Sequence, residues 1–362
     1  FSSTAQDLVP GITNIVSDVF VHDRNLGTLE RVSVSTTGAE ANLATGWPSI
    51  SEDGRFVTFS SRSTTLDWTD LNLRYDIYLH DRQTGVTEAI SDGLAGQPGD
   101  GDSDFSTISG DGKFIAFLSS SSNLVPNDTN GVRDVFVYDV TAKTIERVSL
   151  DAYGNQSPVA CYSQPMISRY GRFVLMRSLG NLGVPTDTND QHDLFLRDRQ
   201  TGSTRRMSLS SLAGQGSFPV DGSGSMSAFG ESVAFNTFSP MTTDDTNLVG
   251  DVFVRELGLP TLLLDLTPVT SGLPTTLTIT GGAPSSVHFI AWNLAGQGEL
   301  PSPWGIFDLA QPFFYFPLVS NPAGQVSLTI VPPPGLTGLP FWVQAIDTTY
   351  ATLSNPAGHI IQ

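Results

Sequence analysis

The chain has very little lysine and a single cysteine. Only Lys113 and Lys143 are lysines among its 18 basic residues, and 36 acidic residues bring the formal net charge to −18. Such a surface repels phosphates, so we expect no nucleic-acid partner. Cys161 has no second cysteine with which to form an intrachain disulfide. No basic residue is evident beside it, and we expect an inert thiol rather than a nucleophile.

Long apolar runs are also missing. None approaches the length of a membrane-spanning helix, so we expect no membrane span. The residues that begin at Phe1 do not show the pattern of a secretory signal peptide. The 35 glycines and 23 prolines, together with the lack of helical periodicity, favour strands and turns. The predicted class is all-β, and the acidic composition suits an exported protein or one that gathers cations.

One short strand pattern, Asp-Val-Phe-Val or a close variant, occurs five times. Its leading aspartates are 58 or 59 residues apart, and an asparagine lies four residues before each. A period of this size predicts a tandem array of one structural unit. The aspartates are Asp18, Asp76, Asp134, Asp193 and Asp251, and the asparagines are Asn14, Asn72, Asn130, Asn189 and Asn247.

Each copy predicts four antiparallel strands, which together make one propeller blade. In the copy around Asp134 we expect strands at residues 106–109, 113–119, 134–139 and 144–150. Glycine stays in the turn between the first two strands, at Gly54, Gly112, Gly171 and Gly230, as a position with φ > 0 requires. Residues 1–257 therefore predict a β-propeller of about five blades. The first blade lacks its first strand and most of its second, and residues 261–266 either complete the last blade or open the next domain.

The composition changes after Arg255, because no lysine or arginine follows it. We place a domain boundary near Gly258–Pro260 and predict a small immunoglobulin-like β-sandwich over residues 258–362. Its expected strands lie at residues 275–280, 287–293, 313–317, 325–331 and 341–347.

The repeats resemble the TolB-like, WD-repeat-like propeller family of bacteria. The resemblance rests on the Ser-x-Asp-Gly-Arg/Lys-Phe-x-x-Phe stretches at 51–59 and 109–117, and on the Asp-Thr-Asn…Asp-Val-Phe-Val stretch at 128–137. It implies a propeller fold. The resemblance says little about function, since the family includes scaffolds, binding modules and enzyme-attached propellers. The C-terminal residues look like a β-sandwich module of exported planctomycete-type proteins, on Gly281-Gly-Ala-Pro, Phe341-Trp-Val-Gln-Ala and Leu353-Ser-Asn-Pro.

Two carboxylate patterns could bind a cation. The repeated Asp-x-Asn-x3-Asp pattern is interpreted as loop-fixing hydrogen bonds, because it recurs in nearly every copy. The other pattern occurs in one copy only and is the candidate calcium site, formed by Asp100, Asp102, Asp104 and Asp111. Phe105 occupies the position where an EF-hand loop needs glycine, and a solvated acidic loop is the alternative.

Other residue types point to binding rather than to catalysis. His22 and His80 share a repeat position with Tyr138, Arg197 and Arg255, from which we expect an exposed face and no metal cluster. No catalytic serine elbow or phosphate-binding glycine loop is present. Aromatic residues in the connections either line a face for sugar or peptide or fill space between blades; they are Trp47, Trp68, Tyr162 and Phe218.

The predicted function is a non-enzymatic binding or structural protein, exported to the cell surface, the extracellular space or the periplasm. Protein partners or self-association through the incomplete blade or the C-terminal domain are expected, and carbohydrate is a further candidate ligand. One alternative is a polysaccharide lyase or hydrolase, which needs histidine, tyrosine, arginine or carboxylate groups converging at the propeller's central opening. Another is a periplasmic partner of an envelope complex.

Overall fold

The computed structural model describes residues 1–257 except 68–69, 152, 184–186, 213 and 248. Between 258 and 362 it describes the strands and residue 325. Trp68, an expected surface aromatic, therefore lies outside the described residues. The chain forms two compact parts, Phe1–Leu257 and Gly258–Gln362, and the division falls just after the last basic residue.

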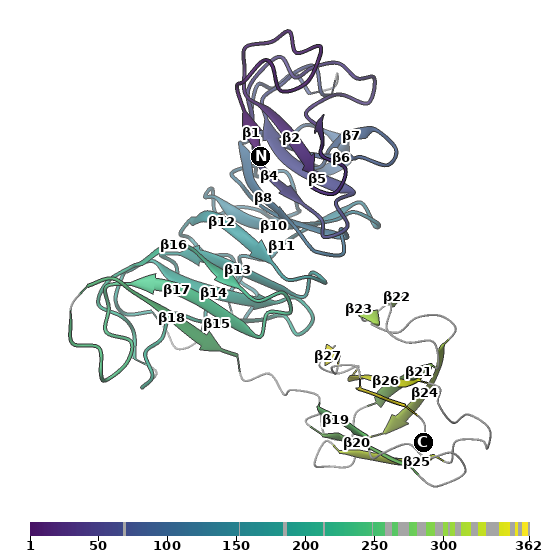
Figure 1. Ribbon diagram of the computed structural model, residues 1–362. Helices are drawn as coiled ribbons and strands as arrows, with labels where there is room; N and C mark the ends of the chain where they lie inside the picture. The colour runs from purple at the N-terminus through teal and green to yellow at the C-terminus, as the bar shows by residue number, and fades with distance from the viewer. Residues whose placement is uncertain are drawn as a thin grey trace. The chain divides into compact units, whose positions relative to one another are not determined.

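The N-terminal part consists of five antiparallel sheets that follow one another along the chain (Figure 1). Sheet 1 contains β1 (Ser2–Ser3), β2 (Asp18–Asp23) and β3 (Thr28–Arg31). Sheet 2 contains β4 (Thr45–Ile50), β5 (Phe56–Ser61), β6 (Asp76–Asp81) and β7 (Val86–Ala89). Sheet 3 contains β8 (Ser103–Ile108), β9 (Phe114–Ser119), β10 (Asp134–Asp139) and β11 (Thr144–Arg147). Sheet 4 contains β12 (Cys161–Ile167), β13 (Phe173–Ser178), β14 (Asp193–Asp198) and β15 (Ser203–Arg206). Sheet 5 contains β16 (Val220–Met226), β17 (Ser232–Thr237) and β18 (Asp251–Glu256).

The repeated strand is the third strand of each four-stranded sheet. In all five sheets it is six residues long and begins at the repeated aspartate, which confirms the predicted array. Sheets 1 and 5 have three strands each, and no other strand of the described residues completes them. The expected turn glycines adopt positive φ angles of 70° to 77°. A Cβ on Gly171 would lie 2.1 Å from the ring of Phe114, so the turn also needs glycine for close packing.

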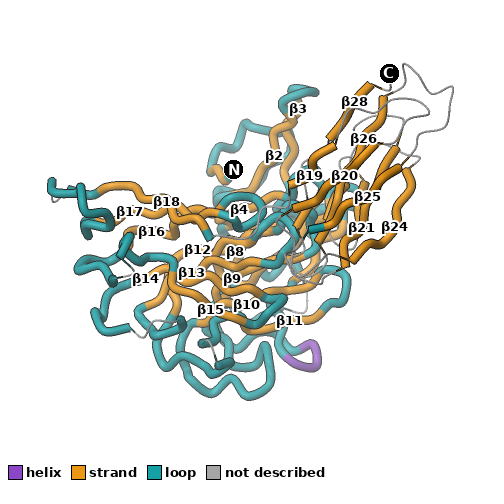
Figure 2. Tube along the Cα trace, turned by 90° about the horizontal axis from the view of Figure 1, so that it is seen from below, coloured by secondary structure: helices purple, strands orange, loops and turns teal. Residues whose placement is uncertain are grey.

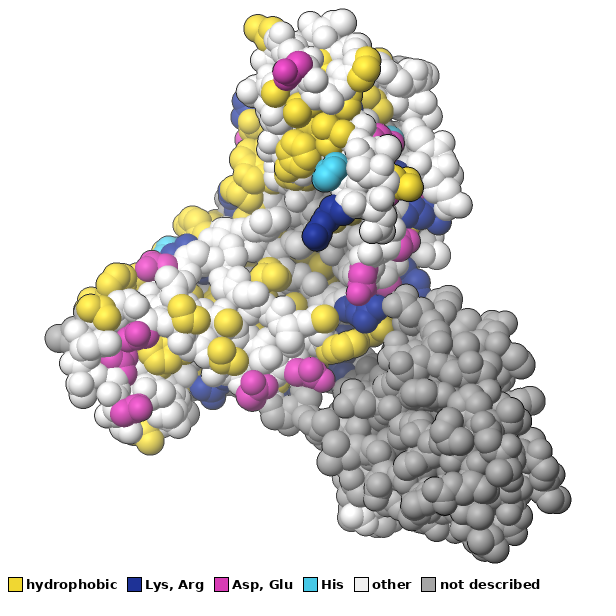
Figure 3. Space-filling view, in the orientation of Figure 1, with side chains coloured by type: hydrophobic (Ala, Val, Ile, Leu, Met, Phe, Trp, Pro, Cys, Tyr) yellow, Lys and Arg dark blue, Asp and Glu magenta, His cyan; other side chains and the backbone are white. Residues whose placement is uncertain are grey.

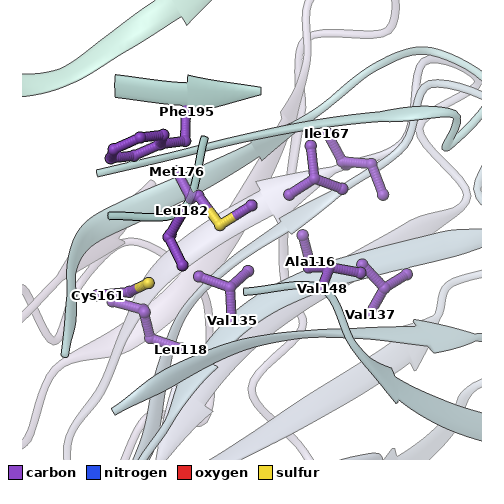
Figure 4. Packing of buried hydrophobic residues seen from close by; sticks show 11 residues of the cluster. Ala116, Leu118, Val135, Val137, Val148, Cys161, Ile167, Met176, Leu182 and Phe195 are labelled. Carbon is purple, nitrogen blue, oxygen red and sulfur yellow. The ribbon is translucent and has the colours of Figure 1, made fainter. Parts of the chain in front are cut away.

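The hydrophobic core lies between successive sheets. In the cluster of Figure 4, Val135 and Val137 of β10 pack with Val174 and Met176 of β13 and with Phe195 of β14. The same arrangement joins sheets 1 and 2, where Val19 packs with Phe59 and Tyr78. Each sheet thus presents branched aliphatic side chains to the next sheet and aromatic side chains to the previous one. Burying one such side chain contributes about 1.5–3 kcal/mol.

Sheet 5 departs from this pattern on one face. Val252 and Val254 of β18 are 74% and 65% exposed, whereas Val135 and Val137 at the same repeat positions are 1% exposed. Figure 3 shows hydrophobic side chains, drawn in yellow, spread over the visible face of the N-terminal part, the end formed by sheet 5 included. The difference arises because no further sheet of the N-terminal part packs against sheet 5.

Strands dominate both parts, and the short helix η1 (Leu94–Gly96) is drawn in purple in Figure 2. Among the described residues no helix is long and apolar enough to cross a membrane. The C-terminal part has a sheet of β19 (Leu263–Leu266), β20 (Thr275–Thr280) and β25 (Val326–Ile330). Because β19 pairs with β20, residues 263–266 belong to this sheet and do not complete sheet 5.

A second sheet of the C-terminal part contains β24 (Phe313–Val319), β21 (Val287–Asn293), β26 (Pro340–Asp347), β27 (Thr352–Leu353) and β28 (Ala357–Ile360). A two-stranded sheet contains β22 (Leu300–Ser302) and β23 (Gly305–Phe307). All five strands expected in this part are present, with ends that differ by at most two residues. The sandwich arrangement itself stays a prediction.

Candidate functional site

The first strands of sheets 2 to 5 follow one another along one edge of the array. We call this edge, formed by β4, β8, β12 and β16, the inner edge (Figure 1). One backbone hydrogen bond per junction ties it to the preceding sheet. The first residue of each inner strand donates its N–H to the carbonyl of the residue just before the repeated aspartate, as in Ser103 to Tyr75 (2.6 Å) and Cys161 to Arg133 (2.8 Å). Residues 75, 133 and 192 therefore lie beside the inner edge.

Each inner strand carries a bulge, where its register with the second strand shifts. The residue at this bulge has a positive φ in all four sheets: +49° at Trp47, +54° at Phe105, +68° at Ser163 and +69° at Gly222. Only glycine adopts this conformation without cost. For Trp47 and Phe105 it costs about 1–3 kcal/mol each, and such strain clusters at functional sites. The bulge re-aims side chains at the inner edge.

Three aromatic rings meet at the junction of sheets 2 and 3. The ring centroid of Trp47 lies 5.6 Å from that of Tyr75 and 5.0 Å from that of Phe105. The guanidinium of Arg62 lies 4.1 Å from the centre of the Tyr75 ring, a cation–π distance. Trp47 keeps 38% of its surface exposed. An exposed indole within a fixed group of rings is a platform for a flat or apolar ligand face.

Charged groups surround this platform. Asp102 accepts a hydrogen bond from the backbone N–H of Tyr75 (2.9 Å) and lies 3.9 Å from Arg62 and 4.0 Å from Arg74. Both arginine side chains are about half exposed, so their N–H groups remain accessible to a ligand. Arg133 forms an ion pair with Asp104. The platform thus combines aromatic faces with donors and acceptors.

The four residues of the candidate calcium site bind different partners. Asp100 accepts hydrogen bonds from Ser122, and Asp111 accepts one from the hydroxyl of Ser109 at 2.6 Å. Asp102 and Asp104 lie beside the arginines described above. No group of three or more potential metal ligands occurs among the residues that the structure describes. Calcium binding stays a prediction, which titration with Ca²⁺ followed by calorimetry can decide.

A second group of polar side chains lies on sheet 4, where it meets sheet 5. Tyr162 of β12 and His192 stack edge to face, with centroids 4.9 Å apart. Arg177 donates a hydrogen bond to the hydroxyl of Ser163 (3.3 Å), and its charge acts on Asp221 and on His192. Burial and the neighbouring Arg177 lower the pKa of His192, so its imidazole is neutral at pH 7. Its buried Nδ1 has no hydrogen-bond partner among the described residues.

In sheets 1 to 4 the repeated asparagine donates a hydrogen bond to a backbone carbonyl of the loop that follows the sheet. It also accepts one from a backbone N–H in the loop before the repeated strand, which is the loop-fixing contact expected from the sequence. Asn130 donates to Asp134 (2.7 Å) and to the carbonyl of Ser157 (2.9 Å). The sequence interpretation missed the serine two residues after the fourth strand. It donates to the aspartate in sheets 1 to 4, at 2.5–2.7 Å, and the four residues are Ser33, Ser91, Ser149 and Ser208.

An arginine on the fourth strand neutralises this network in three of the sheets. Arg147 lies 2.9 Å from Asp128 and 3.7 Å from Asp134. Arg206 lies 3.4 Å from both corresponding carboxylates of sheet 4. In sheet 1, where Ile12 replaces the leading aspartate, Glu40 supplies the second carboxylate, 2.8 Å from Arg31. The recurring Arg-x-Ser at 31–33, 147–149 and 206–208 is the sequence signal that would have predicted this pairing.

The comparisons with known proteins name no family for this chain. No family model matches the sequence, and no curated protein does. Among solved structures, the chain is similar to a protein assigned as TolB from Agrobacterium tumefaciens. The two are 13% identical, the match covers 91% of this chain and 83% of that one, and the TM-score is 0.37. A likeness at this level carries no argument about fold or function, and the planctomycete-type module stays a prediction.

Sheet 2 is the exception to the arginine pattern, because Ala89 stands at the arginine position. The hydroxyl of Tyr78 donates to Asp70 instead (2.8 Å). Burial, with the neighbouring Asp70, raises the pKa of Asp76 to about 8. Asp76 therefore binds a proton in the folded protein that the unfolded chain has released by neutral pH.

This proton makes folding stability fall as the pH rises from about 4 to about 8, since the folded pKa of Asp76 lies above its ordinary value of 3.8. We expect Asp76→Asn to remove this loss, because an amide donates to Asp70 at every pH. Relative to wild type, the variant should gain at least about 1 kcal/mol between pH 5 and pH 8. Urea unfolding at both pH values measures it, and equal gains at the two would contradict the assignment.

Two expectations about single residues have different outcomes. The exposed face expected at His22 and His80 holds for His22, which is exposed, and is wrong for His80. His80 is 3% exposed, and its Nδ1 lies 2.8 Å from the hydroxyl of Thr87. Tyr138 and Arg197 at the same repeat position are also buried, because this face packs between sheets. Cys161 is fully buried at the start of β12, and burial raises its pKa to about 12. The expected inert thiol agrees with this environment.

Proposed function

We propose that this chain is a non-enzymatic binding module, a propeller of about five blades followed by a β-sandwich, whose ligand site is the inner edge at Trp47. The observation that carries the proposal is the pair of bulky residues, Trp47 and Phe105, at left-handed φ angles within one group of stacked rings. Glycine fills the same bulge in sheet 5, at Gly222, so the fold itself does not require a bulky residue at this strained position.

Carbohydrate is the ligand class that fits this site best. The apolar face of a sugar ring stacks on an exposed indole, and its hydroxyl groups pair with guanidinium and carboxylate groups such as Arg62, Arg74 and Asp102. The two half-exposed arginines favour a glycan that carries carboxylates, which form bidentate pairs with guanidinium groups.

Replacing Trp47 by alanine tests the site. We expect about a 30-fold loss of affinity for a uronic-acid oligosaccharide, because a central aromatic anchor contributes about 2 kcal/mol or more. Phe218→Ala is the matched control, because Phe218 is an aromatic residue exposed to a similar extent that lies in the loop before β16 of sheet 5. Calorimetry with a series of acidic and neutral oligosaccharides gives both numbers. Wild-type protein that binds no member of the series, or a variant as tight as wild type, contradicts the proposal.

We further propose that the protein is exported and associates with itself or with protein partners at the cell surface or in the periplasm, including an envelope complex. The three-stranded sheets 1 and 5 and the exposed face of Val252 and Val254 support association, because unpaired strands and uncovered apolar faces recruit partners. Light scattering on natively isolated protein tests it, and a strict monomer that captures no partner counts against it.

A second candidate function is a polysaccharide lyase, favoured by the group formed by Tyr162, His192 and Arg177. A neutral imidazole or a phenolate removes a proton next to a carboxylate, and an arginine holds that carboxylate. Incubation with polyuronates, followed by the ultraviolet absorbance of the unsaturated product, tests this activity. Product formation that disappears in His192→Ala would support the lyase, and its absence at every pH tried leaves the binding module.

A further inference from the structure

A separate pocket of about 420 Å³ lies between sheets 2 and 3. It shares no residue with the inner edge. Its apolar walls come from both sheets and their loops and include Ile90, Leu124, Pro126 and Ile145. The helix η1 lines it as well. A volume of this size is in the range of small-molecule sites, which combine apolar walls with a few polar groups.

The sequence of sheet 2 differs from the other sheets at this pocket. The residue after the repeated serine is Asp92, where sheets 1, 3 and 4 have Val34, Leu150 and Leu209. Those three apolar residues each form a β-bridge across the following loop, and Asp92 forms none. The loop after Asp92 instead contains η1. A carboxylate has thus replaced an apolar side chain at one of the four equivalent junctions.

Two polar groups of the pocket have no partner among the described residues. Asp92 lines it without a hydrogen bond or an ion pair. The ring of Tyr138 is buried, with 7% of the residue exposed, and its hydroxyl makes no hydrogen bond to the described residues. The hydroxyl oxygen is not among the fully enclosed polar atoms, so it reaches the pocket. Both groups face a space in which a ligand can supply a partner.

The electrostatic balance of the pocket is negative. Burial and the nearby Asp67 and Asp70 raise the pKa of Asp92 to about 6, so the carboxyl is mostly ionised at pH 7. Lys143 also lines the pocket, but its ammonium is paired with Glu88. Ala89, in place of the arginine of other sheets, leaves no guanidinium on this part of β7. The carboxylate of Asp92 therefore has no protein cation within ion-pair distance among the described residues.

We propose that this pocket binds an organic cation, a primary ammonium or guanidinium group on an apolar chain. The cationic head of the ligand forms an ion pair with Asp92 and donates a hydrogen bond to the hydroxyl oxygen of Tyr138. The apolar part of the ligand lies against Ile90, Leu124 and Ile145. The apolar walls disfavour a hydrated metal ion, which needs several oxygen ligands. An anion is disfavoured by Asp67, Asp70 and Asp92 together.

Calorimetry with hexylammonium and with 1-hexanol, its neutral counterpart of the same chain length, tests the proposal on the full chain. Wild type should bind hexylammonium saturably and at least about tenfold more tightly than 1-hexanol, since an ion pair to a partly buried carboxylate is worth about 1.4 kcal/mol or more. Asp92→Asn should abolish this tenfold preference and leave 1-hexanol binding unchanged. Asp92→Asn is not expected to unfold the protein, because it removes an uncompensated charge.

Two further variants complete the design. Tyr138→Phe removes only the hydroxyl and should weaken hexylammonium binding about threefold, which gives a second readout should Asp92→Asn unfold. Glu231→Gln, an exposed carboxylate of sheet 5, is the matched control and should bind like wild type. Equal affinities of wild type for the two ligands, no binding of either, or an unchanged preference in Asp92→Asn would each overturn the proposal.

Discussion

Replacing Phe136 by alanine is expected to destabilise the protein by about 3–5 kcal/mol, the usual cost of emptying a fully buried phenylalanine site. Phe136 is fully buried in the middle of sheet 3. It stacks on Phe117 at 5.9 Å and packs against Ile77 and Leu79 of the preceding sheet. Sheets stack on both sides of it, so the cavity cannot collapse easily. The shift of the urea midpoint at constant slope measures the loss.

Phe253→Ala is the matched control, because Phe253 has the same repeat position in sheet 5. It is only half-buried, and the valines on either side of it are exposed. We expect it to cost less than half as much as Phe136→Ala. Equal losses for the two variants would mean that burial between sheets does not set the stability of the array.

Arg147→Ala is expected to have a comparably large effect, for an electrostatic reason. Arg147 is 9% exposed and neutralises Asp128 and Asp134, which are 4% and 1% exposed. Removing one partner of a buried ion pair leaves an uncompensated buried charge and costs about 3–5 kcal/mol. Burial raises the pKa of Asp134 even beside the arginine, so the loss should shrink as acid protonates the carboxyls. Unfolding curves at pH 7 and pH 5 show both effects.

Arg55→Ala provides the comparison at the surface. Arg55 donates two hydrogen bonds to Asp81, at 2.9 and 2.7 Å, but 39% of its side chain is exposed. Pairs of this kind contribute at most about 1 kcal/mol. If Arg147→Ala lowers the free energy of unfolding at pH 7 by no more than Arg55→Ala does, then the ion pairs of Arg147 with Asp128 and Asp134 do not stabilise the loop before β10.

Sequence periodicity predicted the sheets because one pattern carries the whole unit. The Asp-Val-Phe-Val strand, the turn glycine and the alternation in the second strand recur at the same spacing, and all three have local causes. The three-stranded form of sheet 1 was also predictable, since residues 1–3 match the end of a second strand and pair with β2 as expected.

The proposed binding surfaces depend on contacts between residues far apart in the sequence. Such contacts could not be predicted from the sequence. The bulge at Trp47 has no glycine to signal its positive φ. Trp47 and Phe105 are 58 residues apart and meet only when sheets 2 and 3 stack. Asp100, Asp104 and Asp111 each contact a different neighbour, and these partners are not evident from the spacing of the carboxylates in the sequence. His80 suggested exposure because its counterparts are polar, yet their long side chains bury apolar bodies between sheets.

The layered packing of the N-terminal part has a consequence for its dynamics. Each sheet gains its protection from the sheets next to it, so free energies of local opening should be graded along the chain. Sheets 2, 3 and 4 each have neighbours on both sides, and sheet 3, in the middle of the array, should exchange its amide hydrogens most slowly. Sheet 5 has exposed valines, and its outer strand β18 has no second partner strand among the described residues, so it should open first and without unravelling the interior sheets.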